Sequence, residues 1–383
     1  MDGFIYNQPV NGRNFIARKE DAAELSELLR LGENVVMFEP PKTGVSSLLN
    51  YALSTLRTGG RTVVVAQQSL LRIRDVESAA CHIGTAILRT AYNTVEEMQD
   101  AVSELLPGTG FSFDRESYSQ GGPALALSRD LADKDIFDLV TLPCRIPHNE
   151  QARMMVLLED FQNIMLCERG MWFCKMFEKQ LGRPGSQDKK FFSWIFCGSS
   201  YNAMKEIFEI QKFFFFQVKR VKLQRADSKE LVDFANKTFL SAGKVIDKDL
   251  MAGVCKKLKG NLWYFNHFCA ICDGLSKGYI MGPVLDESLS ALINIHEPRF
   301  KSIIEDLTTF QLHLLRAIVD GHKHFSSAET IRKYGLNSSA NVRRLKDALC
   351  KKEIISFNQK DEPEFLDPLF EFWVNEYFFE IRK

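Results

Sequence analysis

The stretch Val35-Val36-Met37-Phe38-Glu39-Pro40-Pro41-Lys42-Thr43-Gly44-Val45-Ser46-Ser47 decides the fold. Its first four residues are a short apolar run, which is typical of a strand buried on both faces of a parallel sheet. A glycine-containing loop follows, and the apolar spacing of a helix returns from Ser46. A strand, a loop and a helix in this order begin a βαβ unit, so we expect a mostly parallel sheet covered by helices.

The loop after this strand has the position of a phosphate-binding loop. Such a loop reads G-x-x-x-x-G-K-[ST]: backbone N–H groups at the helix N-terminus point at the phosphate and the lysine neutralises it. The chain keeps the second glycine, Gly44, and the hydroxyl, Ser46, with Ser47 behind it. Glu39 stands in place of the first glycine and Val45 in place of the lysine. The altered positions bear on activity and not on fold.

Both replacements argue against fast hydrolysis. The loss of one preorganised charge-stabilising group typically costs about 3–4 kcal/mol at the transition state. A carboxylate about 4 Å from a phosphate adds a repulsion of roughly 4 kcal/mol at an effective dielectric near 20, if Glu39 faces the phosphate. Lys42, three residues before Val45, is a candidate substitute cation. The alternative is that Lys42 is an ordinary solvated lysine of a loop.

Further apolar runs predict the remaining strands and helices of the sheet domain. We expect strands at 62–66, 154–158, 192–196 and 218–223, and helical segments at 20–31 and 75–105. Residues 107–125 are the most loop-like stretch of the chain.

Polar residues follow two of these strands at their carboxyl ends. Glu159-Asp160 comes directly after five apolar residues, where metal-binding and water-activating carboxylates lie in this architecture. A helix-capping acid is the alternative. Ser199 and Ser200 follow the next strand, where they are positioned to contact a γ-phosphate, although a turn with an N-cap serine explains them equally well.

The second half of the chain changes character. Residues 228–295 contain helical segments and no convincing strand. From residue 310 the order is a helix, a short helix from Ser327, a helix capped by Ser338 or Ser339, and two short strands at 353–357 and 364–366. This order predicts a winged helix. We therefore expect three domains: 1–226 with the sheet, a helical lid at 227–300, and a winged helix at 301–383.

The presumed recognition helix of the winged helix carries Asn341, Arg343, Arg344 and Lys346 on its outer side. Outward basic residues favour contact with nucleic-acid phosphates. Acidic residues lie nearby, however, and the segment from 310 onward is close to neutral. We expect docking within the chain or onto a protein partner, with DNA contact as the alternative.

Bulk composition excludes several classes of protein. Over 383 residues, 49 basic and 49 acidic residues cancel, so no overall field draws the protein to DNA or anionic lipid. No stretch approaches the roughly 18 apolar residues of a membrane span, and no apolar leader is seen. Nine scattered cysteines predict free thiols in the cytoplasm, and Cys269-x-x-Cys272, without a second pair, does not predict a zinc site.

With the loop, the acidic pair and the Gly-Ser turn in order, the chain resembles the archaeal-type ATPase family. This family is a STAND/AAA+-like group of P-loop ATPases that is also common in Bacteroides-type bacteria. The stretches that carry the resemblance are FIARKE (15–20) for F-x-G-R-x-x-E, NVVMF (34–38) with PPKTG (40–44) for N-V-V-L-x-G-P-R-R-x-G-K-T-S, LLEDFQ (157–162) for L-D-E-F-Q, FCGSS (196–200) for G-S-x-x-x-x-M, GNLWY (260–264) for G-x-P-x-Y, and FLDPLFEFW (365–373) for D-P-L-F-x-x-W. They span nearly the whole chain.

The resemblance implies a P-loop NTPase α/β core with a helical lid and a C-terminal winged helix, binding ATP or ADP with Mg²⁺. It implies Ser46 and Glu159 as metal ligands, and Glu159, Asp160 and Ser199 as the catalytic group. The nucleotide-binding residues that it implies are Arg18, Lys42, Thr43, Gly44, Val45, Ser46 and Ser47. The order Glu159-Asp160 reverses the D-E of the family, and Val45 removes its lysine.

Three functional hypotheses follow. The first is a degenerate ATPase-family protein that acts as a nucleotide-gated switch or scaffold with weak or no hydrolysis. The second is an active ATPase in which Lys42 or Arg18 substitutes for the lost cation. The third is a DNA- or protein-binding protein that does not use nucleotide.

Overall fold

The computed structural model describes residues 3–60, 62–147, 152–182 and 191–379. These residues form two compact units, each described by itself below. The sheet unit comprises residues 20–39 and 48–223, and the helical unit comprises residues 1–19, 40–47 and 224–383. The loop segment 40–47 therefore belongs with the C-terminal half of the chain.

The sheet unit is built on five parallel strands in the order β2-β5-β6-β1-β7. Their bounds are Thr62–Ser69 (β2), Ala152–Glu159 (β5), Phe192–Gly198 (β6), Asn34–Phe38 (β1) and Val218–Arg220 (β7). Every strand predicted from an apolar run is present, so the parallel α/β core is confirmed. The order places β1, which leads into the altered loop, between β6 and β7, and leaves β2 at an edge.

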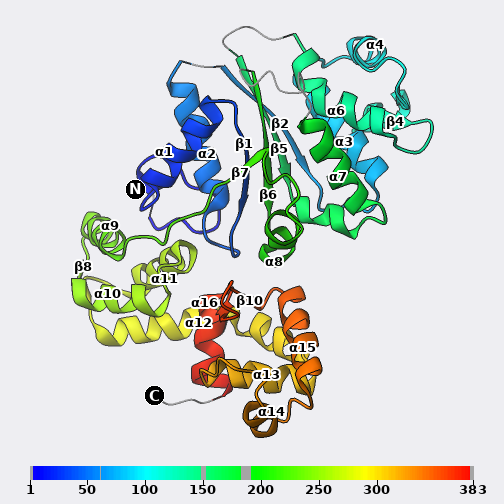
Figure 1. Ribbon diagram of the computed structural model, residues 1–383. Helices are drawn as coiled ribbons and strands as arrows, with labels where there is room; N and C mark the ends of the chain where they lie inside the picture. The colour runs from blue at the N-terminus through cyan, green and yellow to red at the C-terminus, as the bar shows by residue number, and fades with distance from the viewer. Residues whose placement is uncertain (1–2, 61, 148–151, 183–190, 380–383) are drawn as a thin grey trace. The chain divides into compact units, whose positions relative to one another are not determined.

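Helices cover both faces of this sheet (Figure 1). The sheet unit contains α1 (Lys19–Arg30), α2 (Val45–Thr58), α3 (Val76–Leu88), α4 (Val95–Leu105), α6 (Asp133–Arg145), α7 (Gly170–Leu181) and α8 (Tyr201–Lys205), with 3-10 or π turns at Phe161–Leu166 and Glu206–Ile210, and of these helices α4 lies away from the sheet. Aromatic rings fill the space between α7 and β6: Phe177 lies 4.9 Å from Trp194 and 5.9 Å from Phe196 between ring centroids. This packing holds the carboxyl end of β6 against the neighbouring layer.

Part of the predicted loop at 107–125 is ordered structure, which corrects the sequence interpretation. It contains β3 (Phe111–Phe113), α5 (Arg115–Ser119) and the start of β4 (Leu125–Leu127), and β3 and β4 pair antiparallel. The hairpin is fixed from outside, because the Thr85 hydroxyl of α3 accepts the N–H groups of Ala124 and Leu125 at 2.9 and 3.2 Å. The predicted helical stretch 75–105 is two helices, α3 and α4.

The helical unit follows the predicted order of elements. Its lid part has α9 (Ser228–Ser241), β8 (Val245–Ile246), α10 (Lys248–Lys257), α11 (Leu262–Leu275), β9 (Tyr279–Ile280) and α12 (Gly282–Glu305), and η1 (Gly12–Asn14) belongs to the same unit. The expectation of no strand in 228–295 is wrong only for β8 and β9, a two-residue parallel pair.

A winged helix completes the helical unit. It has α13 (Thr309–Val319), α14 (Ala328–Tyr334), α15 (Ser339–Lys351), the antiparallel hairpin β10 (Ile355–Phe357) and β11 (Pro363–Phe365), and α16 (Pro368–Trp373), followed by a π turn at Val374–Phe378. Ser327 and Ser338 cap α14 and α15 by accepting N–H groups three residues on, as predicted. Helix α12 runs without a break through residues 300 and 301, where the sequence suggested a domain boundary.

The lid and the winged helix share one hydrophobic core. Phe300 of α12 lies 5.5 Å from Phe370 and 5.6 Å from Trp373, both of α16. The N-terminal segment joins the same core through Phe4, whose ring is 4.7 Å from that of Phe239 in α9. The division into domains at 226 and 300 stays a prediction.

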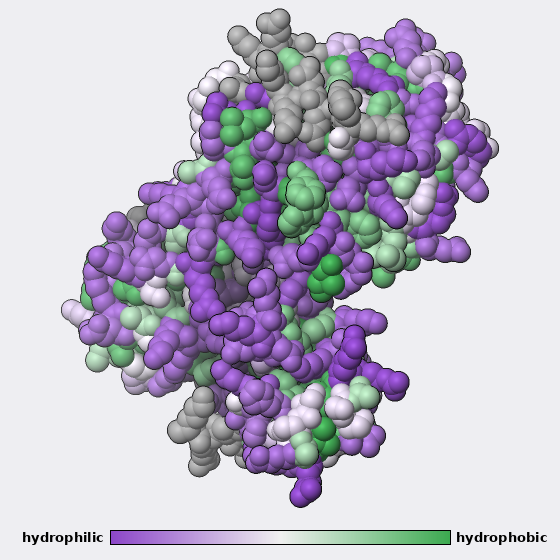
Figure 2. Space-filling view, in the orientation of Figure 1, coloured by the Kyte–Doolittle hydropathy of each residue, from purple (hydrophilic) through white to green (hydrophobic). Residues whose placement is uncertain are grey.

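The surface is that of a polar protein on the side that Figure 2 shows, where hydrophilic residues predominate and hydrophobic residues lie in small separate groups. No helix of the described part is both long and apolar enough to cross a membrane. All nine cysteines are free thiols, as predicted, and six of them are buried.

Candidate nucleotide site

The altered loop Glu39–Gly44 leads directly into α2, whose first residue is Val45. Gly44 has φ +99°, a conformation that side chains rarely adopt, and so glycine is required there. Ser46 is exposed, whereas the Ser47 hydroxyl accepts the N–H of Val10 at 3.1 Å. The Thr43 hydroxyl donates to the carbonyl of Pro40 at 2.8 Å and closes the turn. The segment therefore has the strand–turn–helix form of a phosphate-binding loop, with valine at the lysine position.

Glu39 is paired and does not stand as an isolated charge. Its carboxylate accepts from Arg220 Nη2 at 3.0 Å and from the N–H of Leu223 at 3.2 Å. The Arg220 guanidinium lies 3.6 Å from the centroid of the Phe38 ring, and it also donates to the Phe38 carbonyl. Because an arginine neutralises Glu39, the repulsion that the sequence suggested between this residue and a phosphate is largely cancelled.

Lys42 is held by aromatic residues of the lid. Its ammonium lies 4.3 Å from the centroid of the Trp263 ring and 4.5 Å from that of Tyr264, and it donates to the Tyr264 hydroxyl at 3.0 Å. The Lys42 backbone has φ +68°, which costs a residue other than glycine about 1–2 kcal/mol. The expected alternative of a solvated loop lysine is therefore wrong, because the side chain is half-buried and bound.

The Tyr264 hydroxyl, which accepts from Lys42, also bonds to the winged helix. It donates to Asp367 Oδ2 at 2.8 Å, and Arg299 of α12 donates to both the Tyr264 hydroxyl, at 3.0 Å, and Asp367. Asp367 Oδ1 accepts the N–H groups of Leu369 and Phe370 and so caps α16. Lys42, Tyr264, Arg299 and Asp367, here called the lysine relay, join the loop, the lid and the winged helix by direct hydrogen bonds.

The charges of the lysine relay shift its ionisable groups. Burial and the nearby Arg299 guanidinium lower the pKa of Lys42 to about 8, and Asp367 opposes this only in part. Burial and Asp367 raise the pKa of Tyr264, so its hydroxyl stays protonated and able to donate. Burial, Lys42 and Arg299 lower the pKa of His296, which packs on Trp263, to about 4.

Arg18 bonds to the backbone of the loop. It is 7% exposed and donates to the carbonyl of Thr43 at 3.1 Å and to that of Gln224. These bonds hold the loop backbone in place. Arg18 was a candidate cation for nucleotide, and the structure instead places its guanidinium on backbone carbonyl groups.

The predicted acidic group lies together in the sheet unit. Asp160, with φ +53°, accepts from the Ser199 hydroxyl at 2.7 Å and from the Ser69 hydroxyl at 3.0 Å. Glu159 accepts from Gln67 Nε2 at 2.7 Å. Gln162 donates to Ser199 Oγ at 2.9 Å. Glu159, Asp160 and Ser199 are thus neighbours, as the order of the strands suggested, while the loop segment 40–47 belongs to the other compact unit.

The donor set of this acidic group fits a magnesium ion. Within the described ranges, Glu159 and Asp160 bond to neutral hydroxyl and amide donors and form no ion pair with lysine or arginine. Two uncompensated carboxylates beside hydroxyls are the ligands Mg²⁺ takes when phosphate and water complete its shell. The described residues contain no group of three or more His, Cys, Asp or Glu side chains arranged to hold a metal without such help.

The structure divides the four candidate DNA-contacting residues of α15. Arg343 and Arg344 are exposed. Lys346 is only 15% exposed, pairs with Asp361 and lies 4.7 Å from the centroid of the Phe357 ring. Asn341 donates to the carbonyl of Leu336 at 3.0 Å. Only two of the four are therefore available to a ligand.

Two functional contacts escaped the sequence analysis. Arg220 neutralises Glu39 from 181 positions further along the chain, and no local pattern pairs them. Trp263, Tyr264 and Asp367 lie inside stretches that resemble family motifs, but nothing in their spacing showed that Trp263 and Tyr264 hold Lys42 or that Asp367 bonds to Tyr264.

Comparisons with known proteins agree with this architecture. Residues 298–376 match the family model described as a probable winged helix domain. No curated protein matches the sequence significantly. Among solved structures, the Walker-type ATPase of Pyrococcus abyssi is similar with a TM-score of 0.60 at 13% identity, covering 96% of this chain and 98% of that one. The Aeropyrum pernix ORC2 protein in its ADPNP–ADP complexes has a TM-score of 0.51 at 14% identity, covering 97% of this chain and 96% of that one. The ADP form of that protein has a TM-score of 0.53 at 13% identity, covering 93% and 90%.

The chain therefore has the fold of P-loop ATPases of the Walker type, with a winged helix at its C-terminal end. The predicted resemblance to the archaeal-type ATPases is confirmed at the level of the fold.

Proposed function

We propose that the protein binds ATP or ADP with Mg²⁺ at the altered loop and acts in the cytoplasm as a nucleotide-gated switch with weak or no hydrolysis. The observation that carries this proposal is the lysine relay, in which the one basic side chain of the loop bonds to the lid and, through Tyr264, to the cap of α16. The solved structure of the ORC2 protein with ADPNP and ADP supports nucleotide as the ligand of this fold.

Several features favour retained binding. Helix α2 has 14 residues and begins directly after Gly44, so its first N–H groups offer a site for phosphate. Arg220 neutralises Glu39 and removes most of the repulsion. The family resemblance assigns Ser46 and Glu159 to Mg²⁺, and Asp160, which follows Glu159 in the chain, accepts from the Ser199 hydroxyl. The ion would neutralise phosphate charge, and Asp160 with Ser199 would orient water.

Other features favour slow hydrolysis. Val45 cannot neutralise a phosphate, and the removal of one such group costs about 3–4 kcal/mol at the transition state. Lys42 would have to leave two aromatic rings and a hydrogen bond to replace it. A cation–π contact alone contributes about 1–2 kcal/mol when it is partly desolvated.

The same competition supplies the switch. A phosphate that attracts Lys42 would break the bond from its ammonium to Tyr264, whose hydroxyl also bonds to Asp367. Nucleotide would then be sensed at the N-terminus of α16 in the winged helix. A ligand shifts such an equilibrium only through its different affinity for the two states, and Lys42 provides that difference.

Calorimetry with ATP and Mg²⁺ tests this function. We expect binding in the wild type, and at least tenfold tighter binding with faster phosphate release in Val45→Lys. No heat at millimolar nucleotide, in the wild type and in Val45→Lys, would overturn the proposal in favour of a nucleotide-independent protein. Steady phosphate release by the wild type that disappears in Lys42→Ala, but persists in the exposed-lysine control Lys257→Ala, would instead show an active ATPase that uses Lys42.

The winged helix has a second candidate function, favoured by the exposed pair Arg343 and Arg344. Its shared core with the lid supports the expected role as a regulatory arm docked within the chain, and DNA contact is the alternative. A gel shift over a salt series separates the two. DNA contact predicts binding that falls with salt and is lost in Arg343→Glu/Arg344→Glu.

A further inference from the structure

Strand β2 forms an edge of the sheet and carries no charged side chain. Within the described residues β2 pairs only with β5, and its sequence, Thr62-Val63-Val64-Val65-Ala66-Gln67-Gln68-Ser69, has no charged side chain. Proteins usually protect an edge strand with charges, proline or a bulge, because its unpaired N–H and C=O groups attract other strands. Strand β2 has no charge and no proline over its eight residues, and its register with β5 has no bulge.

The hydrogen-bond register shows which backbone groups face outward. The N–H of Leu70 donates to the carbonyl of Glu159 in β5 at 2.9 Å. In a parallel strand alternate residues turn to the same side, so Gln68, Ala66 and Val64 also face β5. The backbone N–H and C=O groups of Val65 and Gln67 therefore point away from the sheet.

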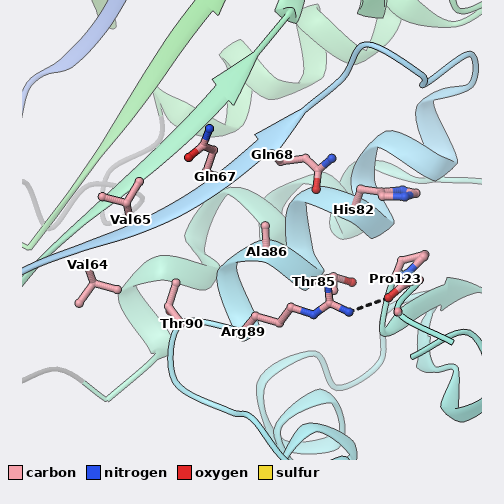
Figure 3. Close-up of a pocket in the computed structure, with 12 residues that line it drawn as sticks. Val64, Val65, Gln67, Gln68, His82, Thr85, Ala86, Arg89, Thr90 and Pro123 are labelled. Atoms are coloured by element: carbon pink, nitrogen blue, oxygen red, sulfur yellow. Dashed lines mark hydrogen bonds between the residues drawn. The ribbon is translucent and has the colours of Figure 1, made fainter. Parts of the chain in front are cut away.

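A cavity of about 490 Å³ lies along this edge. Figure 3 shows it between β2, which contributes Val64, Val65, Gln67 and Gln68, and α3 with the residues after it, among them His82 and Arg89. Side chains from both faces of β2 line the cavity, so it follows the edge of the strand and not one face of the sheet. The loop at Gly121–Pro123 forms another wall.

The charge of this cavity is positive. Arg89 is exposed and donates through Nη2 to the Gly122 carbonyl at 2.7 Å, the bond that is dashed in Figure 3. Its guanidinium also lies 5.3 Å from the centroid of the Tyr118 ring. No Asp or Glu lines the cavity, and Arg89 forms no ion pair with any carboxylate of the described chain. Donors of its guanidinium fork are left for an acidic group.

We propose that this edge binds an extended segment of a partner protein that carries an acidic side chain. The segment would add a strand beside β2, bonding to the outward backbone groups of Val65 and Gln67, and its carboxylate would pair with Arg89. Strand addition of this kind takes its affinity from main-chain bonds and its specificity from the alternate side chains.

Selection from a displayed library of random nonapeptides, made on the full chain, tests the proposal. We expect the recovered peptides to share a Glu or Asp between β-forming residues. Replacing that acid by Lys should weaken binding at least tenfold in fluorescence anisotropy. Arg89→Glu should do the same and should restore binding of the Lys peptide, whereas Arg57→Glu, a charge reversal at another exposed arginine, on α2, should change nothing.

Backbone pairing has its own signature. A selected peptide that is N-methylated at alternate residues should lose binding in one of the two registers and keep it in the other, because only one edge of a strand pairs. Amide hydrogen exchange should slow at Val65 and Gln67 and stay unchanged at Val64 and Ala66. Recovery of no binder sensitive to Arg89→Glu, equal loss in both registers, or self-association of the chain abolished by Arg89→Glu would each overturn the proposal.

Discussion

At the residue scale, some neighbours of Lys42 stabilise its charged ammonium group and others destabilise it. Two aromatic rings and a tyrosine hydroxyl attract the ammonium, while burial and Arg299 lower its pKa to about 8. The unfolded chain binds this proton up to about pH 10.4, the ordinary lysine value. Between these two pKa values the unfolded state binds more protons, so stability from this group rises with pH. Below pH 8 the charged lysine destabilises the fold relative to a neutral one.

This gives a prediction for pH dependence. From pH 7.5 to 9.5 the free energy of unfolding of the wild type should rise relative to that of Lys42→Met, measured by urea denaturation at fixed ionic strength. The window ends at 9.5 because tyrosines begin to titrate above it. A parallel pH dependence of the two proteins would contradict the lowered pKa, and Lys257→Met provides the exposed control.

A second residue-scale prediction concerns Glu39 and Arg220, each 16% exposed. Arg220→Met leaves a half-buried carboxylate without its partner and should cost about 3 kcal/mol of unfolding free energy. Glu39→Gln/Arg220→Met removes both charges and should recover part of that loss. Denaturant unfolding of the two single variants and the double variant measures the coupling. Additive losses would show that the ion pair contributes nothing of its own.

At the element scale, the chain was predictable where local pattern determines structure. The strands of the sheet unit are apolar runs bounded by polar turns, and the caps Ser327 and Ser338 stand at the expected helix starts. The hairpin of β3 and β4 was missed because its three-residue strands are fixed by Thr85, a residue of another helix. The acidic group was predictable because parallel strands end at one edge. The partners of Lys42 and Glu39 were not, since distant segments supply them.

An element-scale prediction follows for α16. Asp367 caps this helix with one carboxylate oxygen and bonds to Tyr264 and Arg299 with the other. Asp367→Ala should therefore lower the unfolding free energy by about 2 kcal/mol, the upper part of the range for a lost cap. Thermal or urea unfolding measures this, and Asp347→Ala, at an exposed position of α15, should stay within about 0.5 kcal/mol of the wild type. Equal effects of the two changes would exclude the capping role.

At the scale of the whole molecule, each compact unit contains a hydrophobic core of its own among the described residues, and these two cores share no residue. Chains with separate cores need not unfold in a single step. We predict two transitions in scanning calorimetry. Phe177→Ala lies in the core of the sheet unit and should lower the temperature of one transition, and Phe300→Ala lies in the core of the helical unit and should lower that of the other. Each change should reduce the unfolding free energy of its unit by about 3–5 kcal/mol. A single transition that both variants shift equally would contradict this division.

Helix α12 determines where a stable fragment that contains the winged helix can begin. Its 24 residues, roughly 36 Å at 1.5 Å per residue, include Leu292 and Ile293 as well as Phe300, all in the shared core. A fragment that starts at residue 298, where the winged-helix match begins, would lack the first 16 residues of this helix. Pro298 is well suited to open a helix, so such a fragment would keep a helical start, yet it would lose Leu292 and Ile293 and so expose part of the shared core to water. A fragment that starts at Gly282 keeps the whole of helix α12.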